Sequence, residues 1–100
     1  MLHIVNKSPY ERNALAACLR LARAGSALLL IEDGVYAATR GNAAEASLRD
    51  AMARRLKVYA LRPDLEARGV AARVMEGIEL VDYGGFVELA CGQPNCQSWL

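Results

Sequence analysis

The three cysteines are the residues of this sequence with the clearest capacity for chemistry. Cys91 and Cys96 stand close together in the stretch CGQPNCQSWL at residues 91–100, and Cys18 is the only other cysteine. A zinc site takes four ligands, usually from two close pairs, and here one loose pair has no second pair of cysteines or histidines to complete it. A CxxC redox motif is absent too. We therefore predict no metal site and interpret Cys91 and Cys96 as cysteines of a helix end and a loop without a chemical role.

Cys18 stands in a different setting, on one face of a predicted helix. The apolar residues of that face recur at helical spacing: Leu15, Cys18, Leu19 and Ala22. Free cysteine is among the most buried residue types, so packing in the core is one interpretation. The alternative is a sulfur nucleophile, which needs a path to solvent and a thiol pKa lowered by Arg12, Arg20 or a neighbouring subunit. The residues alone leave both interpretations open.

No other group of residues assembles a recognisable active site. Glu32 and Asp33 are adjacent carboxylates, but adjacent side chains diverge, and Asp33 before Gly34 is typical of a turn or a helix cap. His3, the only histidine, lies in a predicted strand and is interpreted as a hydrogen-bonded strand residue rather than a base. Neither GxGxxG nor GxxxxGK(S/T) is present, which argues against nucleotide binding, and we predict no cofactor.

Composition and length restrict the class of protein. The chain has 100 residues, of which 54% are apolar, and a formal net charge of +1, so we expect one folded domain over residues 1–100. Acidic and basic residues are interspersed without a basic stripe between aromatics, so no direct nucleic-acid surface is expected. The start MLHIVNKSP lacks the features of a signal peptide, and the longest apolar run, ALLLI, is too short to cross a bilayer. We therefore expect a cytoplasmic protein with reduced thiols and no membrane association.

Short apolar runs alternate with helical patterns along the chain. The predicted strands cover residues 2–5, 27–31, 56–61, 78–81 and 97–100. The predicted helices cover residues 9–24, 42–54, 63–68 and 82–91, and EDGVYAATRGN at 32–42 is expected to form a turn and a short helical segment. This alternation predicts an α/β fold of three layers, α/β/α and flavodoxin-like, around a small, mostly parallel sheet of four to five strands. Sites in such sheets form beyond the carboxyl ends of the strands, here at Asn6–Lys7, Glu32–Gly34, Arg62 and Asp82–Tyr83.

Polar residues mark the predicted starts of the helices. In SPYE at residues 8–11 the serine can cap, the proline fits the first helical position, and the glutamate completes a capping box. Asn42 and Glu45 form a second cap pair. Asp82 is expected to cap the last helix, which Gly92 ends.

A group of apolar residues indicates an interface. They stand at positions where exposure is expected: Val35, Tyr36, Tyr83, Phe86, Trp99 and Leu100. A domain of this size with so many apolar residues commonly uses some of them to contact a partner. We expect EDGVYAA and the aromatic C-terminal region to contribute to such contacts.

Five segments of the chain carry a resemblance to a known family: MLHIVNKSPYERN, LLLIEDGVYAA, KVYALRPDLEARG, VDYGGFVELA and QSWL. In this order and with little gap, they resemble the TusB/DsrH family of sulfur-relay subunits over nearly the whole chain. The resemblance implies the small α/β/α fold of the DsrEFH proteins. It also implies a heterohexamer with two copies each of this chain and of two homologous subunits, one DsrE/TusD-like and one DsrF/TusC-like. Such a complex passes persulfide sulfur to a small carrier protein of the DsrC/TusE type.

The resemblance also bears on which subunit carries sulfur. In relatives that carry it, the principal cysteine belongs to the DsrE/TusD-like subunit and follows the third strand, in a stretch leading to Arg-Gly. The comparable stretch here, ALRPDLEARGV at 60–70, has no cysteine around Leu61–Asp64, which implies an accessory subunit rather than the main catalytic one. DsrH sequences resemble this chain in having a cysteine in the first helix. Cys18 thus becomes a candidate secondary persulfide site, with core packing as the alternative, whereas Cys91 and Cys96 match nothing that the family uses.

Two branches of the family lead to different products. TusBCD complexes serve 2-thiouridine formation at the wobble position of tRNA, and DsrEFH complexes serve dissimilatory sulfur oxidation. NKSPYERN, EDGVYAA and Cys18 look closer to DsrH than to TusB, so we expect a relay subunit in sulfur oxidation, with tRNA thiolation as the alternative. Two further alternatives stay open: an enzyme in its own right with Cys18 as persulfide carrier, and a flavodoxin-like module that binds a small cofactor.

Overall fold

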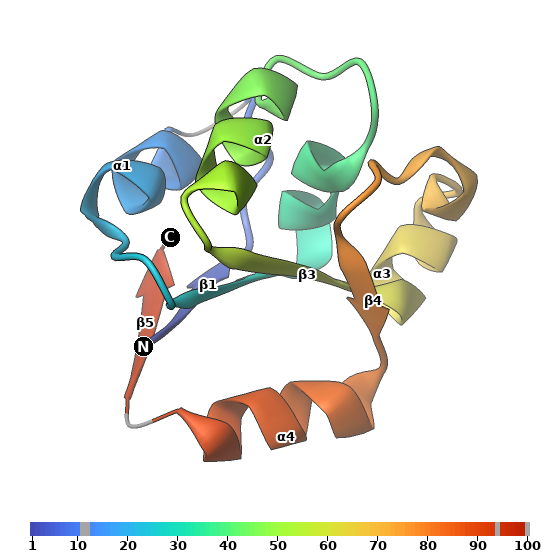
Figure 1. The fold of residues 1–100 in the computed structure, drawn as a ribbon. Helices are drawn as coiled ribbons and strands as arrows, with labels where there is room; N and C mark the ends of the chain where they lie inside the picture. Colours follow the sequence, from blue (N-terminus) through green and yellow to red (C-terminus); the bar gives the residue numbers. More distant parts are fainter. Residues whose placement is uncertain (11–12, 94, 100) are drawn as a thin grey trace.

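Five parallel strands form the sheet at the centre of the fold. A computed structural model describes residues 1–10, 13–93 and 95–99. The strands are β1 (Leu2–Val5), β2 (Ala27–Leu30), β3 (Lys57–Leu61), β4 (Glu79–Val81) and β5 (Cys96–Trp99). Their order across the sheet is β4-β3-β2-β1-β5, and each neighbouring pair runs parallel (Figure 1). The α/β fold expected from the sequence is therefore confirmed, and each strand lies within a residue or two of its predicted range.

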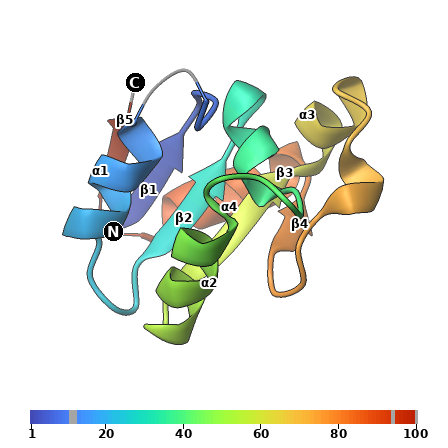
Figure 2. The ribbon, with the colours of Figure 1, turned by 90° about the horizontal axis from the view of Figure 1, so that it is seen from above.

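Helical segments cover the two faces of this sheet unequally. They are α1 (Ala14–Leu21), the 3₁₀ segment η1 (Glu32–Ala38), α2 (Glu45–Ala53), α3 (Arg62–Ala67), the 3₁₀ turn η2 (Ala71–Arg73) and α4 (Tyr83–Gly92). The helices α1 and α2 lie together with η1 over one face, whereas α4 lies over the other face by itself (Figures 1 and 2). No helix in the described part of the chain is long and apolar enough to span a membrane.

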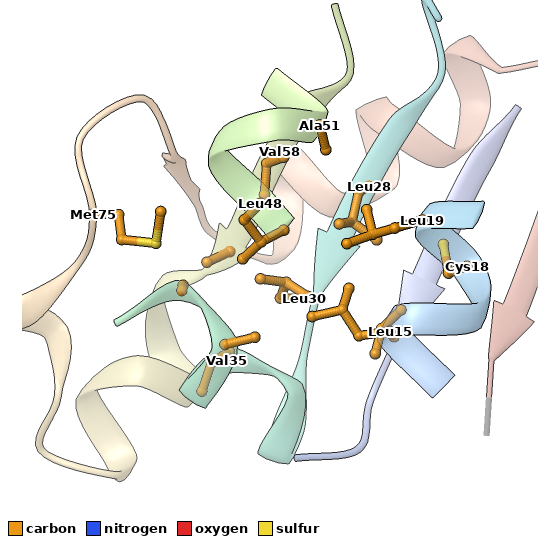
Figure 3. Packing of buried hydrophobic residues seen from close by; sticks show 14 of the residues in the cluster. Leu15, Cys18, Leu19, Leu28, Leu30, Val35, Leu48, Ala51, Val58 and Met75 are labelled. Carbon is orange, nitrogen blue, oxygen red and sulfur yellow. The ribbon is translucent and has the colours of Figure 1, made fainter. Parts of the chain in front are cut away.

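The larger part of the core lies between the sheet and the layer that contains α1, α2 and η1. Leu28 and Leu30 point from β2 into this layer, where they join Leu48 of α2 and Val35 of η1 (Figure 3). A smaller cluster on the other face consists of Leu2, Ala27 and Leu29, packed against partly buried residues of α4. All four residues of β2 are buried because helices cover this central strand on both faces, as its uninterrupted apolar run predicts.

The first helix begins later than the sequence predicts. It starts at Ala14, whereas the pattern SPYE at 8–11 predicts a start at Pro9. The Ser8 hydroxyl accepts a hydrogen bond from the Tyr10 backbone N–H at 3.1 Å, which makes a local turn in place of a helix cap. Glu11, the proposed partner in a capping box, and Arg12 lie outside the described residues.

The other two predicted helix starts are close to the observed ones. Before α2, the Asn42 side chain accepts from the Ala44 N–H at 2.6 Å, and the Glu45 carboxylate accepts from the Gly41 N–H at 2.6 Å. The Asp82 side chain caps α4 by accepting from the Gly85 N–H at 2.8 Å, as predicted. Asp82 thus satisfies a backbone donor that its helix leaves free. The bonds of Asn42 and Glu45 instead hold the loop before α2, whose N-cap Ala44 has no side-chain cap, so the prediction that they cap this helix is wrong.

The expected exposed apolar residues do not all lie at the surface. Val35 is fully buried, so the prediction for this residue is wrong, because η1 folds back onto the core. Tyr36, Phe86 and Trp99 are partly buried, and only Tyr83 is largely exposed. Leu100 lies outside the described residues.

A side-chain hydrogen bond ties the last strand to the first. β5 pairs with β1 from Leu2↔Cys96 to Val5↔Trp99. The indole Nε1 of Trp99 donates to Nδ1 of the buried His3 at 3.1 Å. His3 is therefore a hydrogen-bonded strand residue, as its sequence position predicts, and the proton of its neutral ring is on Nε2. Burial, with a smaller effect of the positive N-terminus, holds the pKa of His3 below its usual value.

We expect the free energy of unfolding to decrease as the pH falls below about 6.5, the usual pKa of histidine. The unfolded chain takes up a proton on His3 there, while the folded chain resists it until its own lower pKa is reached. The loss from this group ends once the folded ring is also protonated, when Nδ1 no longer accepts from Trp99. Urea unfolding from pH 7.5 to 5 checks this in wild type and His3→Gln. An equally steep loss in both proteins would contradict the prediction.

Candidate functional site

Among the residues that the structure describes, the largest group of interacting charged residues lies at the carboxyl ends of β2 and β3. η1 follows β2, and α3 follows β3, so their first residues meet at one edge of the sheet. The Asp64 carboxylate in α3 accepts a hydrogen bond from the Glu32 backbone N–H at 2.6 Å. The Arg68 guanidinium donates to the Asp33 carboxylate at 3.0 Å and to the Asp64 carbonyl at 3.2 Å. These bonds fasten η1 to α3.

Backbone geometry at the start of η1 holds this edge in place. Glu32 has a positive φ of 48°, a left-handed conformation that a residue with a side chain adopts at some cost. Two residues later, Gly34 lies directly against the end of β1. A methyl group at Gly34 would overlap the Val5 carbonyl oxygen and would come within 3.0 Å of its carbon. The turn into η1 therefore requires glycine because two backbone segments touch there.

The sequence predicts a site at this edge of the sheet but not the side-chain contacts that the structure shows there. Glu32 and Asp33 were identified at a strand end, and the structure separates their carboxylates: Asp33 pairs with Arg68, while Glu32 contributes its backbone N–H to the contact with Asp64. Asp64 and Arg68 were not singled out as site residues. Their opposite charges in the segment after the neighbouring parallel strand were the available signal.

Asn6 at the end of β1 has one unexplained polar atom. Its side-chain Oδ1 is buried and has no hydrogen-bond partner among the described residues. Sequence reasoning placed Asn6 at a carboxyl strand end, and the structure keeps it there beside the Gly34 contact. Without a second polar group directed at this atom, Asn6 does not make a binding site.

Cys18 lies in the core. It belongs to α1 and has no exposed surface, and it packs in the large cluster together with Leu15 and Leu19. Burial raises the pKa of the Cys18 thiol to about 12, so the sulfur is protonated at neutral pH. A thiol in this state is a poor nucleophile, because the thiolate is the reactive form. Arg20, one of the proposed activating residues, is exposed.

Cys91 and Cys96 are both exposed, at the end of α4 and the start of β5. Among residues 1–10, 13–93 and 95–99, no group of three or more His, Cys, Asp or Glu side chains is placed to hold a metal ion. The two thiols are thus the ones that solvent reaches, while the family resemblance gives a role only to the thiol that solvent does not reach.

Replacing Asp64 by alanine should lower the free energy of unfolding by about 1 kcal/mol, since the Glu32 N–H loses its acceptor. Glu66→Ala is the matched control, because Glu66 is an exposed carboxylate of the same helix and should stay within about 0.5 kcal/mol of wild type. Urea unfolding followed by circular dichroism measures both. Equal losses in the two variants would show that the Asp64 contact does not stabilise the fold.

Comparison with known proteins places this architecture among relatives. A family model described as DsrH like protein matches residues 7–95. The protein TusB of Escherichia coli (strain K12) is 44% identical over 99 residues, which cover 99% of this chain and 100% of TusB. TusB of Escherichia coli O81 (strain ED1a) is 43% identical over the same share of both chains.

Two solved structures have the same fold. The crystal structure of the ychN protein from E. coli matches with a TM-score of 0.85 and 20% identity, over 98% of this chain and 97% of that one. The protein MTH1491 from Methanobacterium thermoautotrophicum, described as of unknown function, matches with a TM-score of 0.77 and 16% identity, over 97% and 95% of the two chains. At these identities the two structures support the fold alone.

Proposed function

Because this chain belongs to the TusB/DsrH family of sulfur-relay subunits, we propose that it is an accessory subunit of a sulfurtransferase complex and does not itself carry the main persulfide. The observation that carries the proposal is the segment after β3. The family resemblance implies a cysteine here in the subunit that carries sulfur. This chain has none around Leu61–Asp64, and its Asp64 carboxylate accepts the hydrogen bond that joins α3 to η1.

We propose that the partners are two homologous subunits, one DsrE/TusD-like and one DsrF/TusC-like, in a heterohexamer with two copies of each chain. A small carrier protein of the DsrC/TusE type would receive the sulfur. In each transfer the acceptor thiolate attacks the terminal sulfur of the donor persulfide. The donor S–S bond breaks, the donor leaves as a thiolate, and the acceptor holds the new persulfide. This exchange needs accessible thiolates, which the partners supply in this proposal.

For the product of the relay we propose 2-thiouridine formation in tRNA. The support is the identity of 44% and 43% with two proteins named TusB over the full length of both chains. Dissimilatory sulfur oxidation, which the sequence segments favoured, is the second candidate, and the observation for it is a cysteine in the first helix, Cys18.

The experiment is to co-express this chain with its two homologues and isolate the complex through a tag on one of them. We expect this chain to co-purify, and its omission to reduce transfer of radiolabelled sulfur to the carrier. Loss of 2-thiouridine from tRNA after deletion of its gene would favour the first product, and loss of sulfur oxidation would favour the second. A stable monomer that never associates with the homologues would contradict the proposal.

Cys18 stays a candidate secondary persulfide site that this complex can test. With the thiol buried and its pKa near 12, we expect Cys18→Ala to leave sulfur transfer within about twofold of wild type. The substitution should cost about 1 kcal/mol of stability, as small deletions in a core do. Mass spectrometry after incubation with a sulfur donor is the second readout. A gain of one sulfur on Cys18, together with loss of transfer in a folded Cys18→Ala complex, would assign the site.

A further inference from the structure

The helix α4 is apolar on both of its sides. Its sequence YGGFVELACG contains a single charged residue, Glu88. Phe86 and Leu89 face the sheet and are partly buried there. On the outer side Tyr83 and Val87, one helical turn apart, are 62% and 60% exposed. A helix that is apolar all round is ordinarily buried all round, so this helix lacks a cover on its outer side.

The layer that contains α4 is also incomplete at the sheet. Figure 1 shows α4 alone beneath five strands, while several helical segments cover the opposite face. No residue of α4 is fully buried. The partly buried residues of the same cluster outside α4 are the strand residues Ile4, Tyr59 and Val81, together with Ile31 directly after β2. Apolar surface therefore continues from α4 to the underside of the sheet.

Charge is distributed unevenly along the chain. All twelve lysines and arginines lie within residues 7–73, and the charged residues after Arg73 are the four carboxylates Glu76, Glu79, Asp82 and Glu88. Glu79, Asp82 and Glu88 belong to β4 and α4 or join them, and all three are exposed. Asp82 and Glu88 thus place acidic groups beside the apolar outer side of α4, whereas Glu79 shares its surroundings with Lys57 of β3. A partner with lysines or arginines around an apolar centre is complementary to it.

We propose that the outer side of α4, formed by Tyr83, Val87 and Cys91 with Glu88 beside them, docks a homologous subunit through an apolar patch rimmed by Lys and Arg. This inference rests on the proposed function, which supplies a partner of the same fold. The fold can carry such basic surface. Arg23 and Arg55 are exposed in adjacent loops, which the Gly25 N–H bond to the Arg55 carbonyl joins at 3.2 Å, and the exposed Lys57 begins β3.

The test uses the co-expressed complex and two pairs of variants. Val87→Asp places a charge at the centre of the contact and should weaken assembly about 100-fold, as loss of a buried interface residue does. Its control is Leu21→Asp, which charges an equally exposed apolar residue of α1, on the other face of the sheet. Glu88→Lys should weaken assembly about 10-fold and most strongly at low salt, whereas Glu66→Lys on α3 should not. Native mass spectrometry across a dilution series measures all four.

Alkylation of Cys91 gives a readout that needs no substitution. The thiol lies two turns along α4 from Tyr83, so N-ethylmaleimide should modify it at least about 10-fold more slowly in the complex than in the free chain. If Val87→Asp does not fold, this measurement alone tests whether the outer side of α4 is covered in the complex.

The outcomes separate this inference from the proposed function. A complex that assembles normally with Val87→Asp and leaves Cys91 reactive overturns the α4 surface and leaves the sulfur-relay proposal standing. A wild-type chain that never joins the homologues overturns both. If the free chain forms a homodimer and Val87→Asp abolishes that dimer, the surface binds a second copy of this chain. This result would overturn the inference that its partner is a homologous subunit.

Discussion

Gly34→Ala should lower the free energy of unfolding by about 3 kcal/mol or more, enough to leave much of the chain unfolded at 37 °C. The new methyl group would occupy the position of the Val5 carbonyl oxygen. Both groups belong to the backbone framework, so no change of side-chain rotamer relieves the overlap. The same carbonyl accepts the Ile31 N–H at 3.0 Å, and its displacement would also break that bond between β1 and the start of η1.

Gly92→Ala is the matched control for this substitution. Gly92 is the last residue of α4, its φ is not positive, and no atom lies within 4 Å of the added methyl group. Alanine should therefore be neutral or stabilise the fold by up to about 1 kcal/mol, since glycine is a poor helix residue. Urea unfolding at pH 7.5 compares the variants. A Gly34→Ala protein as stable as Gly92→Ala would show that η1 does not touch β1 as described.

N-ethylmaleimide should modify Cys91 and Cys96 at least about 10³-fold faster than Cys18 in the folded chain. The first two thiols are exposed, whereas Cys18 has no exposed surface and a pKa raised to about 12. Alkylation of Cys18 thus requires an opening of the core, and the population of open molecules sets its rate. A time course at pH 7.5 with mass spectrometry of the three cysteine peptides gives the ratio.

The control for this experiment is the same reaction in concentrated urea, where the three thiols should react at similar rates. Cys18 alkylation in the native chain at a rate close to that of Cys91 would mean that α1 opens readily. In that case the first helix could admit a sulfur donor, and Cys18 as a secondary persulfide site would gain support.

The strands were predictable because local patterns specify them. ALLL in β2 is an uninterrupted apolar run, and the structure buries all four residues, so the inference from pattern to burial was direct. Asp82 as the cap of α4 was equally local, since donor and acceptor lie three residues apart. The predicted start of α1 was wrong because a serine hydroxyl can either cap a helix or accept a hydrogen bond within a local turn. Ser8 accepts from the Tyr10 N–H in such a turn.

The contacts of the candidate site were beyond the sequence patterns. The bonds from Glu32 to Asp64 and from Arg68 to Asp33 join residues 32 and 35 positions apart, and they exist because two crossover segments end at the same edge of the sheet. The burial of Val35 has a similar origin, because η1 folds back over β2 and β3 rather than away from them. Periodicity predicts which side of a helix or strand is apolar, but it does not predict against which elements an irregular segment packs.

The attachment of β5 has a consequence for the order of folding. β1 meets β5 through residues such as His3 and Trp99, 96 positions apart, so this closure carries the largest loop entropy of any strand pair in the sheet. Strands β1 to β4 can pair through shorter crossovers and assemble earlier. Until the last strand arrives, β1 presents an open row of N–H and C=O groups to other chains. Refolding yield should therefore fall with protein concentration, through intermolecular pairing at that row.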